Sequence, residues 1–250
     1  MARITSRKNP VVRHMKQLGA SRDYRQARGE CLCDGEKLLG EAVSCGVPVT
    51  CVLTSDPGLY AAYRGADIFL ATEDVLRAAS PLKTPQTVLF ACKIPRTPLP
   101  EAASNLLVLE NIQDPGNLGA MLRTANAFQI GGVLLTGGCA DLYNPKTIRA
   151  SMGAVFRQPV EAVPLEALAE YLRGLPLYGA ALTKDAAPIQ AVSLKNAAVA
   201  VGNEGSGLTK ALLAMCVQCV RIPMNPVSES LNAAAAAAVL MWEMYRAGNL

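Results

Sequence analysis

One stretch near the middle of the chain, residues 106–136, constrains the fold more than any other. Two short apolar runs, 106–109 and 133–135, flank turn residues that lead into apolar residues at helical spacing. This pattern predicts strand, loop, helix and strand, which is a βαβ unit. Ligands of open parallel sheets bind beside the carboxyl ends of the strands. We therefore expect Asn117 and Arg123, near the start of the helix, to lie at a ligand site.

After this unit, segments with apolar residues at helical spacing alternate with short apolar runs typical of strands. The expected elements are a helix at 165–172, strands at 177–182 and 197–201, a helix at 208–215 and a strand at 217–222. Such alternation predicts an α/β fold with a mostly parallel sheet covered on both faces. Six consecutive alanines, 233–238, then predict a last helix suited to close packing against a sheet or a second subunit.

Proline marks the expected domain boundary. Residues 95–103 contain Pro95, Pro98 and Pro100, whose missing amide donors discourage regular structure. We predict a small α/β domain over 1–94, a linker over 95–103 and a second domain over 104–250.

Basic charge is concentrated at the start of the chain. Eight basic side chains and one acidic side chain up to Arg28 give this part a charge of +7, so the remainder carries −3. Such a cluster fits phosphate contacts on a nucleic acid, and it equally fits a solvated basic helix. The candidate RNA-binding residues are Arg7, Lys8, Arg13, Lys16 and Arg149.

The composition predicts where the protein is located in the cell and whether its cysteines bind a metal. No apolar run approaches the ~18 residues of a membrane helix, and the polar start lacks the core of a secretory signal. We expect a cytoplasmic protein without a membrane partner, whose eight cysteines stay reduced. The pairs Cys31/Cys33 and Cys216/Cys219 lack the four-ligand pattern of zinc, so we expect no metal.

Three polar loops follow predicted strands. They are QDPGNLGAMLR after Glu110, GNEGSG at 202–207 and IPMNPVSESLN at 222–232. GNEGSG matches neither the dinucleotide fingerprint nor the P-loop, although its glycines permit close approach to a ligand. The only histidine, His14, lies far away in the sequence, which excludes Ser-His or Cys-His machinery from the second domain. The remaining candidates for a general acid or base are Glu110, Asp114, Glu204, an arginine or a group on the substrate.

The segments ENIQDPGNLGAMLRTA, VAVGNEGSGL and IPMNPVSESLNAAAA, in this order, resemble the three signature motifs of the SpoU family of RNA ribose 2′-O-methyltransferases in the SPOUT superfamily. SRKNPVVRHMKQL and DGEKLLGEAV also resemble that family's N-terminal L30e-like substrate-binding domain. The resemblance implies S-adenosylmethionine (AdoMet) as methyl donor, a trefoil knot in the second domain and a homodimer whose active site combines both subunits.

The resemblance also assigns roles to single positions. The implied catalytic residues are Asn117, Arg123, Glu204, Ser230 and Asn232, and the implied cofactor-binding residues are Gly202, Ile222, Met224 and Leu231. The chain departs from the family at Pro226, where glycine is usual, and at Ala233, where serine is frequent. A free arginine has a pKa above ~12, so Arg123 suits phosphate binding and alkoxide stabilisation better than proton abstraction.

We therefore predict an RNA ribose 2′-O-methyltransferase, with ribosomal RNA favoured over tRNA because tRNA-specific relatives often lack the N-terminal domain. One alternative is a non-catalytic RNA-binding protein that retains the SPOUT fold. Another is a nucleotide-binding enzyme, which the α/β alternation alone permits and the missing fingerprint disfavours.

Overall fold

The computed structural model describes residues 2–61, 66–82, 84–225, 227 and 230–249, so Pro226 lies outside the described residues. The chain forms two compact units, each described by itself below. Unit 1 contains Met1–Arg96 and Asp141–Phe156, and unit 2 contains Thr97–Ala140 and Arg157–Leu250. In the described ranges, no helix has the length and apolar character needed to cross a membrane.

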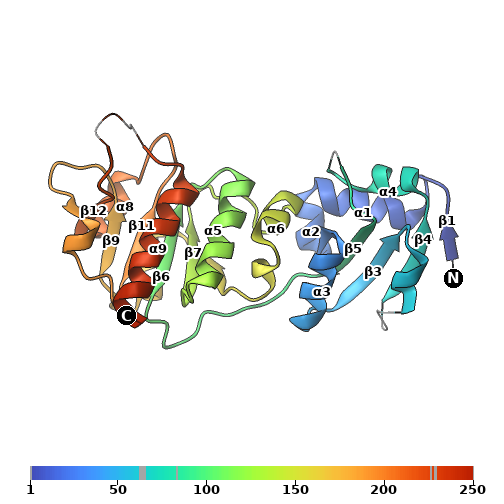
Figure 1. Ribbon diagram of the computed structural model, residues 1–250, viewed down its shortest axis with the longest axis horizontal. Coiled ribbons are helices and arrows are strands. Elements are labelled where there is room, and N and C mark those ends of the chain that lie inside the picture. Colours follow the sequence, from blue (N-terminus) through green and yellow to red (C-terminus); the bar gives the residue numbers. More distant parts are fainter. Residues whose placement is uncertain (1, 62–65, 83, 226, 228–229, 250) are drawn as a thin grey trace. The chain divides into compact units, whose positions relative to one another are not determined.

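Unit 1 is built on a mixed sheet with the strand order β1-β4-β3-β5-β2. Figure 1 labels β1, β4, β3 and β5 of this sheet. The strands are β1 (Ala2–Ile4), β2 (Glu30–Asp34), β3 (Val49–Thr54), β4 (Asp67–Ala71) and β5 (Val88–Lys93). β1, β4 and β3 run parallel, whereas β5 is antiparallel to both β3 and β2. Helices and strands alternate along this unit, as expected for a small α/β domain.

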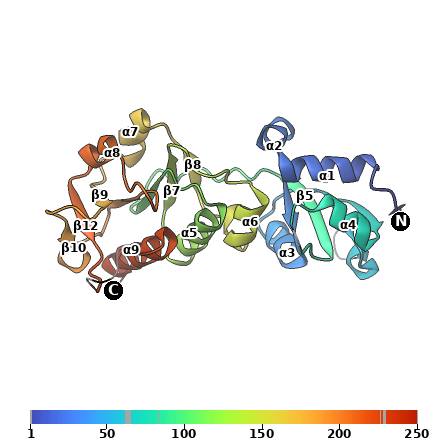
Figure 2. The ribbon, with the colours of Figure 1, turned by 90° about the horizontal axis from the view of Figure 1, so that it is seen from above.

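Two apolar clusters cover the two faces of this sheet. The helices of unit 1 are α1 (Pro10–Ala20), α2 (Arg22–Arg28), α3 (Glu36–Ser44), α4 (Glu73–Ala79) and α6 (Pro145–Ser151). α1 and α4 pack together on one face (Figure 2), where they meet Leu32 of β2. The other face carries Cys31 and Cys33 of β2 under α3 and the segment that contains α6. Alternation along β2 thus directs side chains into two different clusters.

Unit 2 is built on a sheet whose strand pairings are all parallel, in the order β10-β12-β9-β11-β6-β7-β8. The strands are β6 (Leu106–Glu110), β7 (Gly132–Thr136), β8 (Val160–Ala162), β9 (Leu177–Ala180), β10 (Ala187–Pro188), β11 (Ala198–Val201) and β12 (Gln218–Arg221). The predicted α/β class with a parallel sheet is confirmed. Buried strands explain the continuous apolar runs, since both faces of a parallel sheet are covered.

The helices of unit 2 are α5 (Pro115–Ala127), α7 (Leu168–Leu172), α8 (Lys210–Met215) and α9 (Ala233–Asn249). The apolar stripe expected for α5 is Leu118, Leu122, Ala125 and Phe128. The first three are fully buried, whereas Phe128 follows the helix as its C-cap and is half-buried. α5 and α9 lie side by side (Figure 1), and the small residues of α9 permit this approach. The predicted helix at 165–172 begins as a 3-10 turn, Leu165–Ala167, and continues as α7.

Candidate active site

The candidate site lies at the carboxyl ends of the central strands of unit 2. β11 and β6 are neighbours although they are far apart in the sequence, and the strand order changes direction between them. A switch of this kind leaves a crevice for a ligand outside the strand ends. The loops that follow β6, β11 and β12 all start at this edge.

The loop after β6 is fixed at both of its ends. Asn111 has a φ of 57°, and its Oδ1 accepts a hydrogen bond of 2.7 Å from the amide of Gly138. Asp114 caps α5, because its Oδ1 accepts a hydrogen bond of 2.8 Å from the amide of Asn117. Pro115 follows as the first helical residue, where no amide donor is required. Asn117 is thereby held in the first turn of α5.

The loop after β11 folds around one side chain. Asn203 Oδ1 accepts hydrogen bonds from the amides of Gly205, at 2.9 Å, and Ser206, at 3.2 Å. Its Nδ2 donates to the carbonyl oxygen of Asn111 at 3.1 Å, which joins this loop to the loop after β6. A Cβ at Gly202 would lie 2.3 Å from the carbonyl carbon of Gly207, so only glycine fits there.

A polar chain connects all three loops. Asn117 Nδ2 donates to the carboxylate of Glu204, and Asn117 Oδ1 accepts a hydrogen bond of 3.1 Å from Asn232 Nδ2. Asn232 also begins α9, because its Oδ1 accepts hydrogen bonds from the amides of Ala234, at 2.9 Å, and Ala235, at 3.2 Å. One residue from each predicted motif therefore meets at this edge, and both ends of the Asn117 amide are used.

A cavity of about 450 Å³ opens beside the polar chain of Asn117, Glu204 and Asn232. Its lining includes six of the residues singled out by sequence: Gly202, Glu204, Ile222, Met224, Ser230 and Leu231. Apolar side chains such as Leu208 and Leu240 complete the wall. The size lies within the range of about 300–1,000 Å³ typical of small-molecule sites. The size and the mixed polar and apolar wall fit a nucleoside-sized ligand such as AdoMet.

Arg123 is placed differently from the other candidate catalytic residues. It is exposed on α5, six residues beyond Asn117, and it is absent from the cavity lining. In the described part of the chain, no hydrogen bond or ion pair holds its guanidinium. The side chain is therefore available to a substrate that approaches α5 from solvent.

Two of the carboxylates considered for acid–base work have structural tasks instead. Glu110, 3% exposed, accepts hydrogen bonds of 2.7 Å from both the amide and the hydroxyl of Thr209, which begins α8. Asp114 is committed to the cap of α5. Glu204 remains as the carboxylate that lines the cavity.

The candidate RNA-binding residues all lie in unit 1. Lys8, Arg13, Lys16 and Arg149 are exposed, the first three along or just before α1 and the last on α6. Arg7 forms an exposed ion pair of 3.2 Å with Asp74. An exposed pair of this kind contributes little to stability and leaves the charge accessible.

The cysteines are all free thiols. Cys31 and Cys33 meet Cys92 of the neighbouring strand, with sulfur–sulfur distances of 3.5 Å from Cys31 and 3.8 Å from Cys33 to Cys92. All three are buried in an apolar cluster, and burial raises the pKa of the Cys33 thiol. Burial also raises the pKa of Cys216 to about 11. The absence of a metal site stays a prediction.

Sequence reasoning missed Asn111 and Thr209, which shape the loops but do not line the cavity. A non-glycine residue at positive φ and a threonine after a glycine-rich loop give no distinct sequence signal. It also missed the buried pair of Arg25 and Asp141, whose partners are 116 positions apart.

Comparison with known proteins agrees with this geometry. Residues 104–242 match the SpoU rRNA Methylase family, and residues 9–90 match the MRM3-like substrate binding domain. The 23S rRNA (guanosine(2553)-2′-O)-methyltransferase RlmP of Bacillus subtilis is 34% identical, over 98% of this chain and 99% of its own. The 23S rRNA (uridine(2479)-2′-O)-methyltransferase of Streptomyces viridochromogenes is 29% identical, over 98% of this chain and 92% of its own.

Solved structures agree along nearly the whole chain. The AdoMet-bound rRNA methyltransferase from Sinorhizobium meliloti superposes with a TM-score of 0.87 at 26% identity, covering 98% of this chain and 97% of that one. The SpoU methyltransferase AviRb from Streptomyces viridochromogenes, in complex with AdoMet, gives 0.86 at 26% identity and covers 96% and 98%. The fold and the three-loop site therefore define a methyltransferase of the SPOUT class.

The chain belongs to the SpoU rRNA methylase family. The resemblance inferred from the three motifs is thus confirmed, together with the N-terminal substrate-binding domain.

Proposed function

We propose that this protein transfers a methyl group from AdoMet to a ribose 2′-hydroxyl of ribosomal RNA. The observation that carries the proposal is the polar chain of Asn117, Glu204 and Asn232 beside the cavity, because it joins the three family motifs in one place. The names of the relatives from Bacillus subtilis and Streptomyces viridochromogenes support ribosomal RNA over tRNA.

The cavity residues hold the methyl donor. Gly202 lets the glycine-rich loop close on its own backbone beside the cavity, and Ile222, Met224 and Leu231 supply the wall. AdoMet, when bound, supplies a methyl group on a positively charged sulfur, which is already a good electrophile. The protein then has to align the ribose hydroxyl, and such alignment lowers a barrier by about 7–11 kcal/mol in favourable cases.

The polar residues act on the RNA side. We assign the alignment of the ribose to Asn117, Asn232 and Ser230. Glu204 places a carboxylate at the mouth of the cavity. Arg123 binds phosphate and stabilises the oxygen as it loses its proton, since an arginine with a pKa above ~12 is a poor base at neutral pH. The proton passes to Glu204, the carboxylate that lines the cavity. Lys8, Arg13, Lys16, Arg7 and Arg149 bind phosphates of the same RNA from unit 1.

The functional form is a homodimer. α9 exposes Val239, at 38%, and Trp242, at 41%, and Trp242 packs with Phe128 and Tyr245 into an aromatic group. An exposed group of this kind is typical of an interface. Light scattering after gel filtration should give twice the monomer mass of 26.3 kDa, and a monomer would contradict the assignment.

Two expectations accompany this proposal. A ribosomal RNA substrate favours a cytoplasmic location, and the trefoil knot implied by the family stays a prediction.

The test is methyl transfer from labelled AdoMet to unmodified ribosomal RNA and to tRNA, with Arg123→Ala beside the wild type. We expect label in ribosomal RNA, and a fall in kcat of about a hundredfold in the variant, the usual effect of removing one group that stabilises a developing oxyanion. AdoMet affinity should be the same for both proteins, since Arg123 is outside the cavity. Binding of AdoMet without labelling of either RNA would favour the non-catalytic alternative.

A further inference from the structure

The segment Asp141–Phe156 belongs to unit 1, although the chain enters it from β7 and leaves it toward β8, both strands of unit 2. Its apolar residues join the core of unit 1: Ile148 is fully buried, and Val155 and Phe156 are 2% and 3% exposed. They pack in the cluster that contains β2, β5 and α3. The segment is therefore a structural part of the substrate-binding unit.

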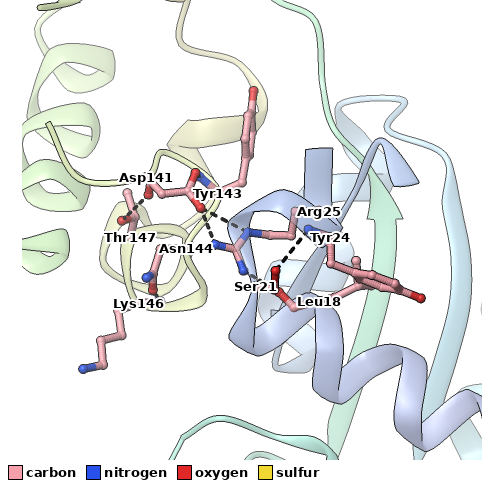
Figure 3. Close-up of polar contacts among 9 residues, drawn as sticks. All are labelled: Leu18, Ser21, Tyr24, Arg25, Asp141, Tyr143, Asn144, Lys146 and Thr147. Carbon is pink, nitrogen blue, oxygen red and sulfur yellow. Dashed lines mark hydrogen bonds and ion pairs between the residues drawn. The ribbon is translucent and has the colours of Figure 1, made fainter. Parts of the chain in front are cut away.

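A buried ion pair fastens the start of this segment to α2. Arg25 is 4% exposed, and its Nη1 donates to the carbonyl oxygen of Leu18 at 2.5 Å. Its Nε donates to Asp141 Oδ2 at 3.1 Å, and its Nη2 bonds the same oxygen (Figure 3). A buried charge that loses its partner is strongly destabilising, so each member of the pair depends on the other.

Asp141 also sets the conformation that begins α6. Its Oδ1 accepts a hydrogen bond of 3.0 Å from the amide of Tyr143, and its carbonyl oxygen accepts one of 3.0 Å from the hydroxyl of Thr147. Asn144 caps the helix by accepting a hydrogen bond of 2.9 Å from the amide of Lys146. Figure 3 shows the Lys146 side chain extending away from the ion pair.

The exposed side chains of α2 and α6 carry mostly positive charge. α2 exposes Arg22 and Arg28, and α6 exposes Lys146 and Arg149, whereas Asp23 is the only acidic residue in their sequences. Arg25 is neutralised by Asp141, so the exposed charge comes from the other basic residues. Clustered lysine and arginine side chains of this kind bind phosphates.

We propose that Arg25 and Asp141 are positioning residues that hold the segment Asp141–Phe156 on the substrate-binding unit, where Lys146 and Arg149 contact RNA phosphates together with α2. This inference rests on the proposed function. It assigns to the RNA-binding surface a segment that lies in sequence between two strands of unit 2, β7 and β8. The chain connects this segment at 140–141 to the part that follows β7 and at 156–157 to the part that precedes β8.

The experiment compares Asp141→Asn with the wild type in methyl transfer to ribosomal RNA. The KM for RNA should rise on the order of tenfold, because the phosphate contacts lose their fixed positions. The kcat at saturating RNA and the affinity for AdoMet should stay unchanged. Asp67→Asn is the matched control, since it is the same substitution at an exposed residue of unit 1, the first residue of β4.

Lys146→Gln separates positioning from simple stability. It should weaken RNA binding in the wild type and reduce the slope of log affinity against log salt by about 0.7–0.9, the value for one phosphate contact. In the Asp141→Asn background the same substitution should have little further effect. Equal effects of Lys146→Gln in both backgrounds, or an unchanged KM in Asp141→Asn, would overturn the inference.

A double variant, Arg25→Met with Asp141→Leu, replaces the pair with apolar side chains and avoids a lone buried charge. It should fold and bring the KM for RNA back toward the wild-type value, because apolar packing can fasten the segment as well. A double variant that folds but keeps the raised KM would count against a fastening role. Absence of RNA methylation by the wild type would refute the proposed function instead.

Discussion

The two units hold their polar groups in opposite ways. In unit 2, Glu204 and Asn232 both hydrogen-bond the Asn117 side chain at the mouth of a cavity, so the three side chains hold one another in place. In unit 1, Lys8 and Lys16 extend from the surface. Fixed positions suit a reaction in which two atoms must be aligned, whereas spread charge suits affinity for a phosphate backbone. Under the proposed function, we expect unit 2 to set the rate of methyl transfer and unit 1 to set the affinity for RNA.

The largest effect that sharpens this comparison is expected from Asn117→Ala. The substitution removes the link between Glu204 and Asn232, so kcat should fall by about a hundredfold, the usual effect of a misplaced catalytic group. Steady-state kinetics with saturating RNA measures it. Asn126→Ala, the same change near the other end of α5, is the control and should retain wild-type kcat.

The next effect concerns the cofactor alone. A Cβ at Gly202 would meet the Gly207 backbone at 2.3 Å, so Gly202→Ala should displace the loop and weaken AdoMet binding by about tenfold or more. Gly205→Ala should have a much smaller effect, because its nearest neighbour, Asn203 Oδ1, would lie at 3.5 Å. Calorimetry of AdoMet binding compares the two variants, and similar losses in both would argue against close approach at Gly202.

A smaller effect is expected from the basic surface of unit 1. The double variant Lys8→Gln and Lys16→Gln should raise the KM for RNA and reduce the salt slope by about 0.7–0.9 per residue, while AdoMet affinity stays constant. The double variant Lys184→Gln and Lys195→Gln, an equal charge change at exposed residues of unit 2, serves as the control. A reduced kcat without a changed KM would break the division of labour between the units.

Sequence reasoning predicted much of unit 2 because its information is local. Short apolar runs, the Asp114-Pro115 helix start and the glycine-rich loop each fall within a few residues, and the structure places them as strand, helix and strand-end loop. The meeting of Asn117 with Glu204 and Asn232 followed from the motifs. Their hydrogen bonds did not, because they depend on which strands become neighbours.

The segment Asp141–Phe156 shows what sequence pattern does not reveal. Its position between β7 and β8 gives no sign that Ile148 and Phe156 complete the core of unit 1. Arg25 is one of the eight basic residues at the start of the chain, yet it is buried against Asp141. A long-range ion pair leaves no periodic signal, so the sequence alone predicted the charge of this region and not its arrangement.

The smallest expected effect concerns a buried carboxylate of unit 1. Asp34 is 7% exposed, and burial raises its pKa although the Gln86 amide, the Ser80 hydroxyl and Arg149 favour the charged form. The folded protein therefore keeps this proton to a higher pH than the unfolded chain does, and the free energy of unfolding falls as pH rises through this range. Asparagine carries no charge and can hydrogen-bond both Gln86 and Ser80.

Asp34→Asn should accordingly be at least as stable as the wild type at neutral pH, with an advantage that disappears as pH falls below the ordinary range of an aspartate. Thermal unfolding of both proteins across this pH range measures the difference. An advantage that grows toward acid would contradict a raised pKa.

The central claim is tested most directly by locating the methyl group on the RNA. Ribosomal RNA labelled by the wild-type protein and AdoMet is hydrolysed in alkali, which cleaves after every free 2′-hydroxyl. The account predicts label in alkali-resistant dinucleotides, because the methylated ribose blocks cleavage. Label recovered in single nucleotides, which would place the methyl group on a base, would contradict it.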